Sequence, residues 1–238
     1  MLKKTHPLLI TFFLITCSRP PEFLRVPALF SDGMILQRDT TVTVWGQSLP
    51  LSNVQLYPSW SPVVTTKSDS NGNWKIQCLT TKDHNTHTLT IKSGKEKIDI
   101  KNILMGEVWL ASGQSNMEMN FDYCCNTTDS SEQVLSNDIF NNIRMFNVKK
   151  DYQLNPSSSI KGRWVHAIKD SIKTFSAVGY FFAKNLHNSL NIPVGIIHSS
   201  WGGSDIESWI SKNALSSIKD FGKRLSSKEN INMAKNSD

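Results

Sequence analysis

The sequence predicts a β-sandwich as the N-terminal domain, followed by an incomplete α/β domain with a parallel sheet. Up to Ile103, short runs in which apolar, often β-branched, and polar residues alternate lie between turn residues, as in small antiparallel sandwiches. After Ile103, longer apolar runs alternate with a segment of helical spacing, as in α/β domains. We therefore expect a leader over residues 1–22, a β-sandwich over 23–103 and a partial α/β domain over 104–238.

The leader is predicted by its charge and its length. Lys3 and Lys4 precede the uncharged run Leu8–Thr16, which has the length of a signal-peptide core and about half of the ~20 residues that a membrane-spanning helix needs. We expect an exported protein, located in the periplasm, at the cell surface or in the medium. Leu14-Ile15-Thr16-Cys17 resembles a bacterial lipobox, which leaves a lipid anchor at Cys17 open. No later segment is long and apolar enough to span a membrane.

The N-terminal strands are expected where the alternation is clearest. The segments that share it are Thr41–Trp45, Val54–Tyr57, Val63–Thr66, Trp74–Ile76, His87–Ile91 and Lys97–Ile100. Asn71-Gly72, before Trp74, is a strong signal for a hairpin turn. No catalytic pattern occurs in this part of the chain.

The second domain is predicted from three apolar runs and one helical pattern. Met105–Ala111, Ile143–Val148 and Pro193–His198 are candidates for buried strands, and Phe175–Leu190 has the spacing of an amphipathic helix. Three strands are few for a parallel sheet that is covered on both faces. We therefore expect this domain to be incomplete.

The composition favours a globular protein that binds neither nucleic acid nor metal. Of the 238 residues, 39% are hydrophobic, and they include 11 Phe and 7 Trp that can fill a core. The net charge of +6 is spread along the chain without a run of five basic residues, which is not typical of nucleic-acid binding. Cys78, Cys124 and Cys125 form no Cys-x-x-Cys spacing, so we expect no metal and no cofactor.

The candidate chemistry lies directly after the strand Met105–Ala111. The strand ends abruptly in Ser112-Gly113-Gln114-Ser115-Asn116. A serine at a tight turn from strand to helix can present its Oγ at the carboxyl edge of a sheet, where amides at the helix start can face an oxyanion. Serines are also common as helix caps, and the residues alone leave both interpretations open.

Four ordered segments extend this motif into a family resemblance. Gly106–Met119 (GEVWLASGQSNMEM) resembles the nucleophile block of the SGNH hydrolases, and more narrowly of the sialate O-acetylesterases. The further segments that resemble this family are Phe30–Arg38, Phe175–Phe182 and Ile192–Trp209, with Ser204 where the family usually has Thr. The resemblance covers residues 27–215 and implies a β-sandwich followed by a three-layer SGNH domain.

The resemblance implies roles for particular residues. Ser115 is the expected nucleophile, with Gln114, Asn116, Gly179 and Gly203 expected in the oxyanion or substrate pocket. For the glycines, tight turns and close packing are an equally good explanation. Trp201, Glu207 and Trp209 are candidates to line a sugar site, although core packing and a helix-start acid explain them as well.

One family element is missing from the sequence. The resemblance implies a histidine base in an Asp-x-x-His element, and none of the six histidines has an aspartate three residues before it. His198, at the end of an apolar strand, is either a substitute base or a structural residue. We therefore expect that the chain stops before its Asp-x-x-His and that this part alone is a weak or inactive esterase.

The expected function is removal of O-acetyl groups from sialic acids through a serine acyl-enzyme. Two alternatives stay open: an acetyl esterase for plant polysaccharide such as xylan, and a non-catalytic truncated module that binds glycans. An Asp-x-x-His in the reading frame after Asp238 would favour an enzyme, and its absence would favour the module.

Overall fold

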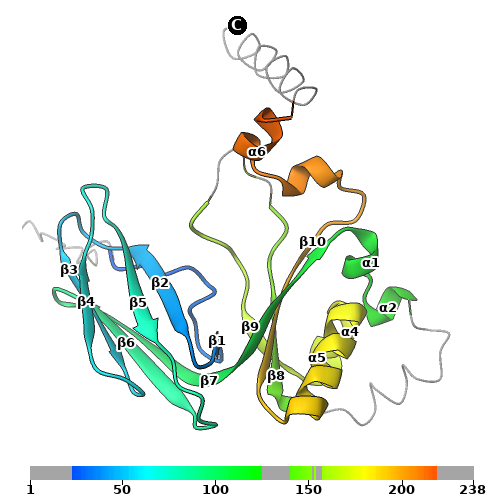
Figure 1. The fold of residues 1–238 in the computed structure, drawn as a ribbon, viewed down its shortest axis with the longest axis horizontal. Helices are drawn as coiled ribbons and strands as arrows, with labels where there is room; N and C mark the ends of the chain where they lie inside the picture. The colour runs from blue at the N-terminus through cyan, green and yellow to red at the C-terminus, as the bar shows by residue number, and fades with distance from the viewer. Residues whose placement is uncertain (1–22, 125–139, 152, 154–156, 219–238) are drawn as a thin grey trace, which may run out of the picture.

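The computed structural model describes residues 23–124, 140–151, 153 and 157–218. Within these ranges the chain forms a mixed sheet with parallel and antiparallel strands, and few helices (Figure 1). The predicted leader and Cys17 lie outside the described residues. None of the described helices is long and apolar enough to cross a membrane.

The N-terminal lobe combines strands of two sheets. β2 (Thr41–Gln47) and β5 (Asn73–Leu79) pair antiparallel as a separate two-stranded sheet. β3 (Asn53–Pro58) lies between β4 (Val64–Lys67) and β6 (His87–Ser93) and is antiparallel to both. The predicted strands of this lobe are thus confirmed.

Both sheets of this lobe bury apolar side chains in one common core. Burial alternates along β5 and β6, so each strand turns one face to the core and the other to solvent. Val54 and Leu56 of β3 pack in the same cluster as Trp74 and Ile76 of β5. The alternation of apolar and polar residues in the sequence therefore arises because each of these strands is buried on one face only.

The predicted hairpin at Asn71-Gly72 is wrong, although the turn itself is present. Asp69 accepts hydrogen bonds from the Asn71 and Asn73 amides at 2.8 Å, and Gly72 has a φ of +82°. The flanking strands do not pair with each other, because β4 pairs with β3 and β5 pairs with β2. The turn therefore carries the chain from one sheet to the other.

Strand β7 (Glu96–Gly113) runs through both lobes (Figure 1). It pairs in turn with β6, antiparallel, and with β1 (Ile35–Gln37) and β10 (Val194–Ser200), both parallel. The two strands predicted over 97–100 and 105–111 are therefore one strand, and residues 103 and 104, the predicted domain boundary, lie inside it. Beyond residue 106, β10 is its only partner strand among the described residues.

The C-terminal lobe is built around the parallel strands. β10 lies between β7 and β8 (Phe140–Asn147), parallel to both, and β9 (Trp164–Ala167) adds an antiparallel edge. Helices α4 (Lys169–Lys173) and α5 (Ala177–Leu190) lie against one face of these strands and close a second core. Ser176 caps α5 by accepting a hydrogen bond from the Gly179 amide at 3.0 Å.

A buried arginine links β8 to the N-terminal lobe. The Arg144 guanidinium donates to the Gly33 carbonyl and to the Asn102 Oδ1, each at 2.8 Å. Burial lowers the pKa of Arg144 to about 10. Asn102, at a φ of +56°, lies at the point where β7 leaves β6, so the cation holds the junction between the two lobes.

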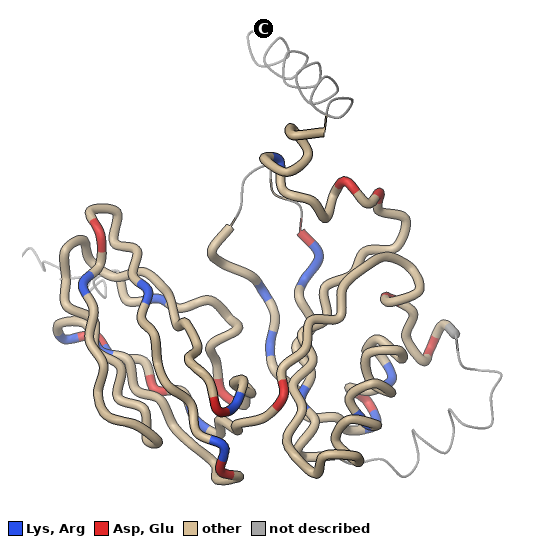
Figure 2. Tube along the Cα trace, in the orientation of Figure 1, with Lys and Arg blue, Asp and Glu red and all other residues tan. Residues whose placement is uncertain are grey.

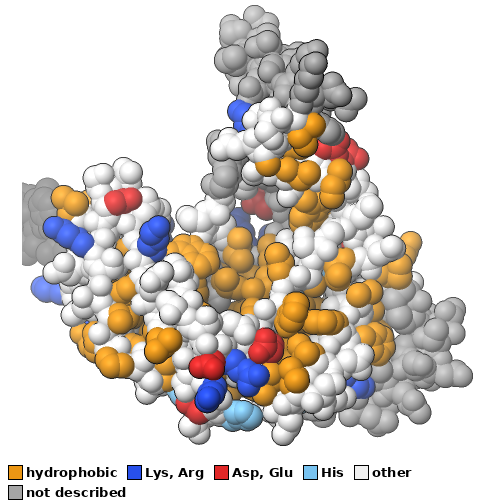
Figure 3. Space-filling model, viewed as in Figure 1, with side chains coloured by type: hydrophobic (Ala, Val, Ile, Leu, Met, Phe, Trp, Pro, Cys, Tyr) orange, Lys and Arg blue, Asp and Glu red, His pale blue; other side chains and the backbone are white. Residues whose placement is uncertain are grey.

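The surface shows dispersed charge and some apolar exposure. Lysines, arginines and acids are spread over both lobes (Figure 2). Hydrophobic side chains gather on the face that carries β7 and α5 (Figure 3). Among the exposed ones, Trp109 and Leu110 of β7 are 47% and 66% exposed.

Candidate functional site

Two strand ends bring the predicted motif and a second turn together. β7 and β10 are parallel and in register, with Ser112 opposite Ser199 and Gly113 opposite Ser200. The Trp201 amide donates to the Gly113 carbonyl at 2.9 Å. The turns that follow both strands therefore meet at the carboxyl edge of the sheet, where ligands of open α/β sheets bind.

Ser115 occupies the first position of the short helix α1 (Ser115–Glu118) and is exposed. Gly113 has a φ of +140°, which lets the chain turn sharply out of β7. The Gln114 carbonyl accepts from the Met117 and Glu118 amides at 3.0 and 2.9 Å and closes the helical turn. Ser115 and its exposed neighbours Gln114 and Asn116 thus project at the sheet edge.

The turn after β10 packs against Ser115. A Cβ added at Gly202 would lie 3.6 Å from the Ser115 Cα and 3.7 Å from its Cβ. The Gly202 amide donates to the Glu118 carboxylate, which also forms an ion pair with Lys150. Because Lys150 is hydrogen-bonded to it, the pKa of Glu118 lies below its usual range. Glu118 therefore holds the Gly202 turn beside the serine.

His198 is buried below this turn, and both of its ring nitrogens are used. Nδ1 lies 2.6 Å from Asn147 Oδ1, and Nε2 lies 2.6 Å from Ser200 Oγ. Burial lowers the pKa of His198, so the imidazole is neutral at pH 7. An amide oxygen only accepts, which places the proton on Nδ1 and makes Nε2 the acceptor of the Ser200 hydroxyl. No hydrogen bond joins His198 to Ser115 within the described residues.

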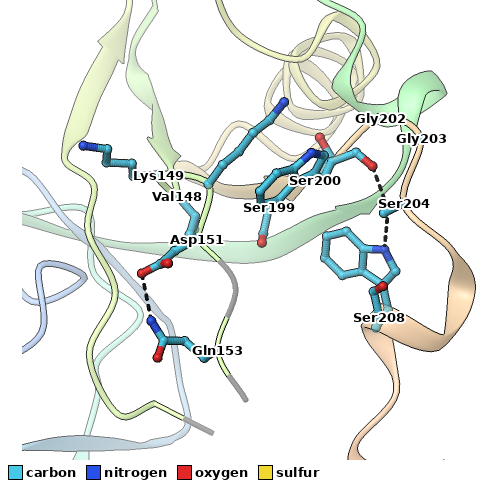
Figure 4. Close-up of a pocket in the computed structure, with 13 residues that line it drawn as sticks. Val148, Lys149, Asp151, Gln153, Ser199, Ser200, Gly202, Gly203, Ser204 and Ser208 are labelled. Carbon is cyan, nitrogen blue, oxygen red and sulfur yellow. Dashed lines mark hydrogen bonds between the residues drawn. The ribbon is translucent and has the colours of Figure 1, made fainter. Parts of the chain in front are cut away.

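A cavity of about 550 Å³ opens beside this arrangement (Figure 4). Its walls come from the segments after two strand ends, Val148–Asp151 after β8 and Ser199–Ser204 around the end of β10, and from Trp209. Trp201 and Trp209 supply aromatic surface, and Trp209 Nε1 donates to Ser204 Oγ at 2.9 Å. A smaller cavity of about 270 Å³ is lined by Gln114 and shares Ser204 and Trp209 with the larger one.

The structure brings together most of the predicted site residues. Gln114, Ser115 and Asn116 lie in one turn, and Gly203 lines the larger cavity with a φ of +76°. Gly179 lines neither cavity: it lies in the first turn of α5, and its amide donates to Ser176 Oγ. Trp201 and Trp209 line the larger cavity, whereas Glu207 lines neither cavity.

Sequence reasoning missed Asn147, Ser200 and the pair of Glu118 with Lys150. The sequence held a signal for Asn147 and Ser200, because both lie within two residues of the end of a strand predicted to be parallel. Ligands of open α/β sheets bind at such strand ends. The contact of Glu118 with Lys150 joins α1 to the segment after β8 and has no signature in the sequence. In the described part of the chain, no three His, Cys, Asp or Glu side chains gather as a metal site.

The fold that carries this sheet edge is similar to that of a carbohydrate acetylesterase. The chain is similar to the crystal structure of a carbohydrate acetylesterase from Xanthomonas citri, with a TM-score of 0.75 and 32% identity over 81% of this chain and 43% of that one.

The chain is also similar in sequence to proteins named sialate O-acetylesterase. The chain is 26% identical over 209 residues to sialate O-acetylesterase from Homo sapiens and 24% identical to the Mus musculus protein of the same name. These alignments cover 80% of this chain and 39% and 38% of the relatives, so the chain spans about two fifths of their length. No protein-family model matches. The predicted resemblance to the sialate O-acetylesterases is confirmed.

Proposed function

We propose that this chain is the serine-bearing part of an exported carbohydrate O-acetylesterase that removes O-acetyl groups from sialic acids. The observation that supports the proposal most is the exposed Ser115 at the strand-to-helix turn, held against Gly202 beside an aromatic-walled cavity. In this proposal the N-terminal lobe is a β-sandwich, and the C-terminal lobe is the first part of an SGNH domain.

The proposed chemistry is transfer of the acetyl group through Ser115. The Ser115 oxygen attacks the acetyl carbonyl carbon, the bond from that carbon to the sugar oxygen breaks, and the sugar leaves as an alcohol. Water then hydrolyses the acetyl-serine. Gln114, Asn116 and the Gly203 amide are the nearby groups proposed to face the substrate, and Trp201 and Trp209 are proposed to contact the sugar ring.

The base for Ser115 is not among its described contacts. A serine hydroxyl is a weak nucleophile at neutral pH, and a positioned base raises the rate by about 10²–10⁴-fold. Because His198 bonds to Asn147 and Ser200 instead, we propose that the 238 residues alone turn over acetyl esters only weakly through Ser115.

A second substrate class is favoured by one comparison. The Xanthomonas citri relative is named for carbohydrate in general rather than for sialic acid. An acetylated polysaccharide such as xylan is therefore the alternative substrate of the same Ser115 chemistry.

The test compares two serines of one motif. The gene product, with any sequence that its reading frame adds after Asp238, is assayed for acetate release from O-acetylated sialic acid and from acetylated xylan. Ser115→Ala is expected to lower kcat at least about 10³-fold, and Ser112→Ala is the matched control that retains most activity. Activity that survives Ser115→Ala would refute the assignment, and faster release from xylan would favour the alternative substrate.

A further inference from the structure

We propose that Ser200, His198 and Asn147 form a second nucleophilic site, which shares the larger cavity with the proposed Ser115 site but does not need the Ser115 hydroxyl, and in which Ser200 accepts small acyl groups from activated esters. The three side chains lie in a line at the end of β8 and β10, with two hydrogen bonds of 2.6 Å. A nucleophile, a base and a group that orients the base are the parts that serine and cysteine hydrolases share, and asparagine serves as the third member in some of them.

The tautomer of His198 that carries its proton on Nδ1 gives the hydrogen-bond directions that nucleophilic attack requires. Asn147 Oδ1 accepts from Nδ1–H, which leaves the lone pair of Nε2 directed at the Ser200 hydroxyl. A buried and neutral imidazole can take the hydroxyl proton, whereas an imidazolium cannot. The charged groups that act on this ring are Glu118 from α1 and Lys150 from the segment after β8, and they also bond to each other.

Ser200 can be reached from the larger cavity. It is one of the residues that line the 550 Å³ space, although only 8% of its surface is exposed. This limits the substrate to a small acyl group on a good leaving group. The Gly203 amide, in the wall of the same cavity, donates to no acceptor among the described residues and is available to a developing oxyanion.

The proposed step is a balanced acyl transfer. The Ser200 oxygen attacks the acetyl carbonyl of 4-nitrophenyl acetate while its proton moves to His198 Nε2. The bond from the acetyl carbon to the phenol oxygen breaks, and 4-nitrophenolate leaves. Ser200 then carries the acetyl group, and His198 releases its proton to solvent.

Site mapping after a short reaction tests the proposal. The 238-residue chain is mixed with 4-nitrophenyl acetate, quenched in acid and digested, and acetyl groups are assigned to residues by mass spectrometry. We expect acetyl-Ser200 in the wild type and in Ser115→Ala, and an acetylation rate at least about 10²-fold lower in His198→Gln. Ser189→Ala, at an exposed serine of α5 that lines neither cavity, is the control and leaves the rate unchanged.

A second variant covers the case in which His198→Gln does not fold. Asn147→Asp places a carboxylate at Nδ1, which raises the pKa of His198 and moves the pH midpoint of Ser200 acetylation upwards. A structural role for Asn147 would leave this midpoint in place. No acetyl group on Ser200, equal acetylation of Ser199 and Ser200, or an unmoved midpoint would overturn the proposal. Acetylation of Ser115 is assigned separately, so each serine is judged by itself.

Discussion

Replacement of Glu118 by alanine should loosen the turn that lies against Ser115. The carboxylate accepts from the Gly202 amide and pairs with Lys150. A hydrogen bond to a charged group contributes about 1.5–3 kcal/mol. The ion pair adds at most about 1 kcal/mol, because the Glu118 and Lys150 side chains are 29% and 47% exposed. We expect Glu118→Ala to lower the free energy of unfolding by about 2–3 kcal/mol.

The glutamine variant separates the two contributions. Glu118→Gln keeps an oxygen for the Gly202 amide but loses the ion pair and the charge on this acceptor, so the expected cost is about 1 kcal/mol, which is smaller than for alanine. For a chain of this size, calorimetry should show a Tm about 4–12 °C lower for Glu118→Ala and at most about 4 °C lower for Glu118→Gln. Glu207→Ala is the matched control, because no hydrogen bond or ion pair of its carboxylate is described.

The pH dependence has a definite sign. The folded state lowers the pKa of Glu118 below its ordinary value of 4.5, so the stabilisation is present above pH 4.5 and is lost as the pH falls through the folded pKa. The difference between wild type and Glu118→Ala should therefore shrink in acid. Equal losses for the alanine and glutamine variants, or a difference that does not shrink as the pH falls below 4.5, would refute the reasoning.

Three further predictions concern the fold and the leader. Gly106→Ala should cost about 3 kcal/mol or more in urea unfolding, since the new Cβ would lie 2.1 Å from the Pro193 carbonyl oxygen; a normal midpoint would contradict this. Ser176→Ala should cost about 1 kcal/mol by removing the cap of α5, and Ser176→Asp should restore most of it; no loss in the alanine variant would show that the cap is dispensable. Mass spectrometry of the natural protein should find residues 1 to about 17 removed, or, if the lipobox is used, a mature N-terminus at a lipid-bearing Cys17; an intact Met1 would exclude export by this leader.

A strand was predictable from the sequence where a single pattern of apolar and polar residues runs along its whole length. The alternation in Asn73–Leu79 places each strand face correctly, because one side is core and the other is solvent. β7 escaped prediction as a unit, because its first half alternates and its second half is apolar. Alternation and a continuous apolar run follow one another along one strand, and the change between them resembles a domain boundary. The expectation that the whole run Met105–Ala111 is buried is wrong, because Trp109 and Leu110 are exposed. β1 has three residues, too few for any period.

Only those residues of the candidate site that are neighbours in the sequence were predictable. Gln114, Ser115 and Asn116 are neighbours in the chain, so a motif could place them together. Glu118 with Lys150, and His198 with Asn147, meet only because β8, β10 and α1 end at one edge. Gly179 was expected in the pocket because of the family resemblance, but its amide is committed to the cap of α5.

The continuity of β7 has a consequence for how the molecule unfolds. Its residues are hydrogen-bonded to β6 in the first lobe and to β10 in the second, and Arg144 bonds beside the junction. A break in either ladder removes support from the other, so amide protons in both cores should exchange together, as one cooperative unit. Many contacts of β7 join residues far apart in sequence, including Glu107 with Val194, which makes closure of this strand a slow step in folding. We therefore expect the serine turn at the end of β7 to reach its place beside Gly202 only once β7 and β10 have paired.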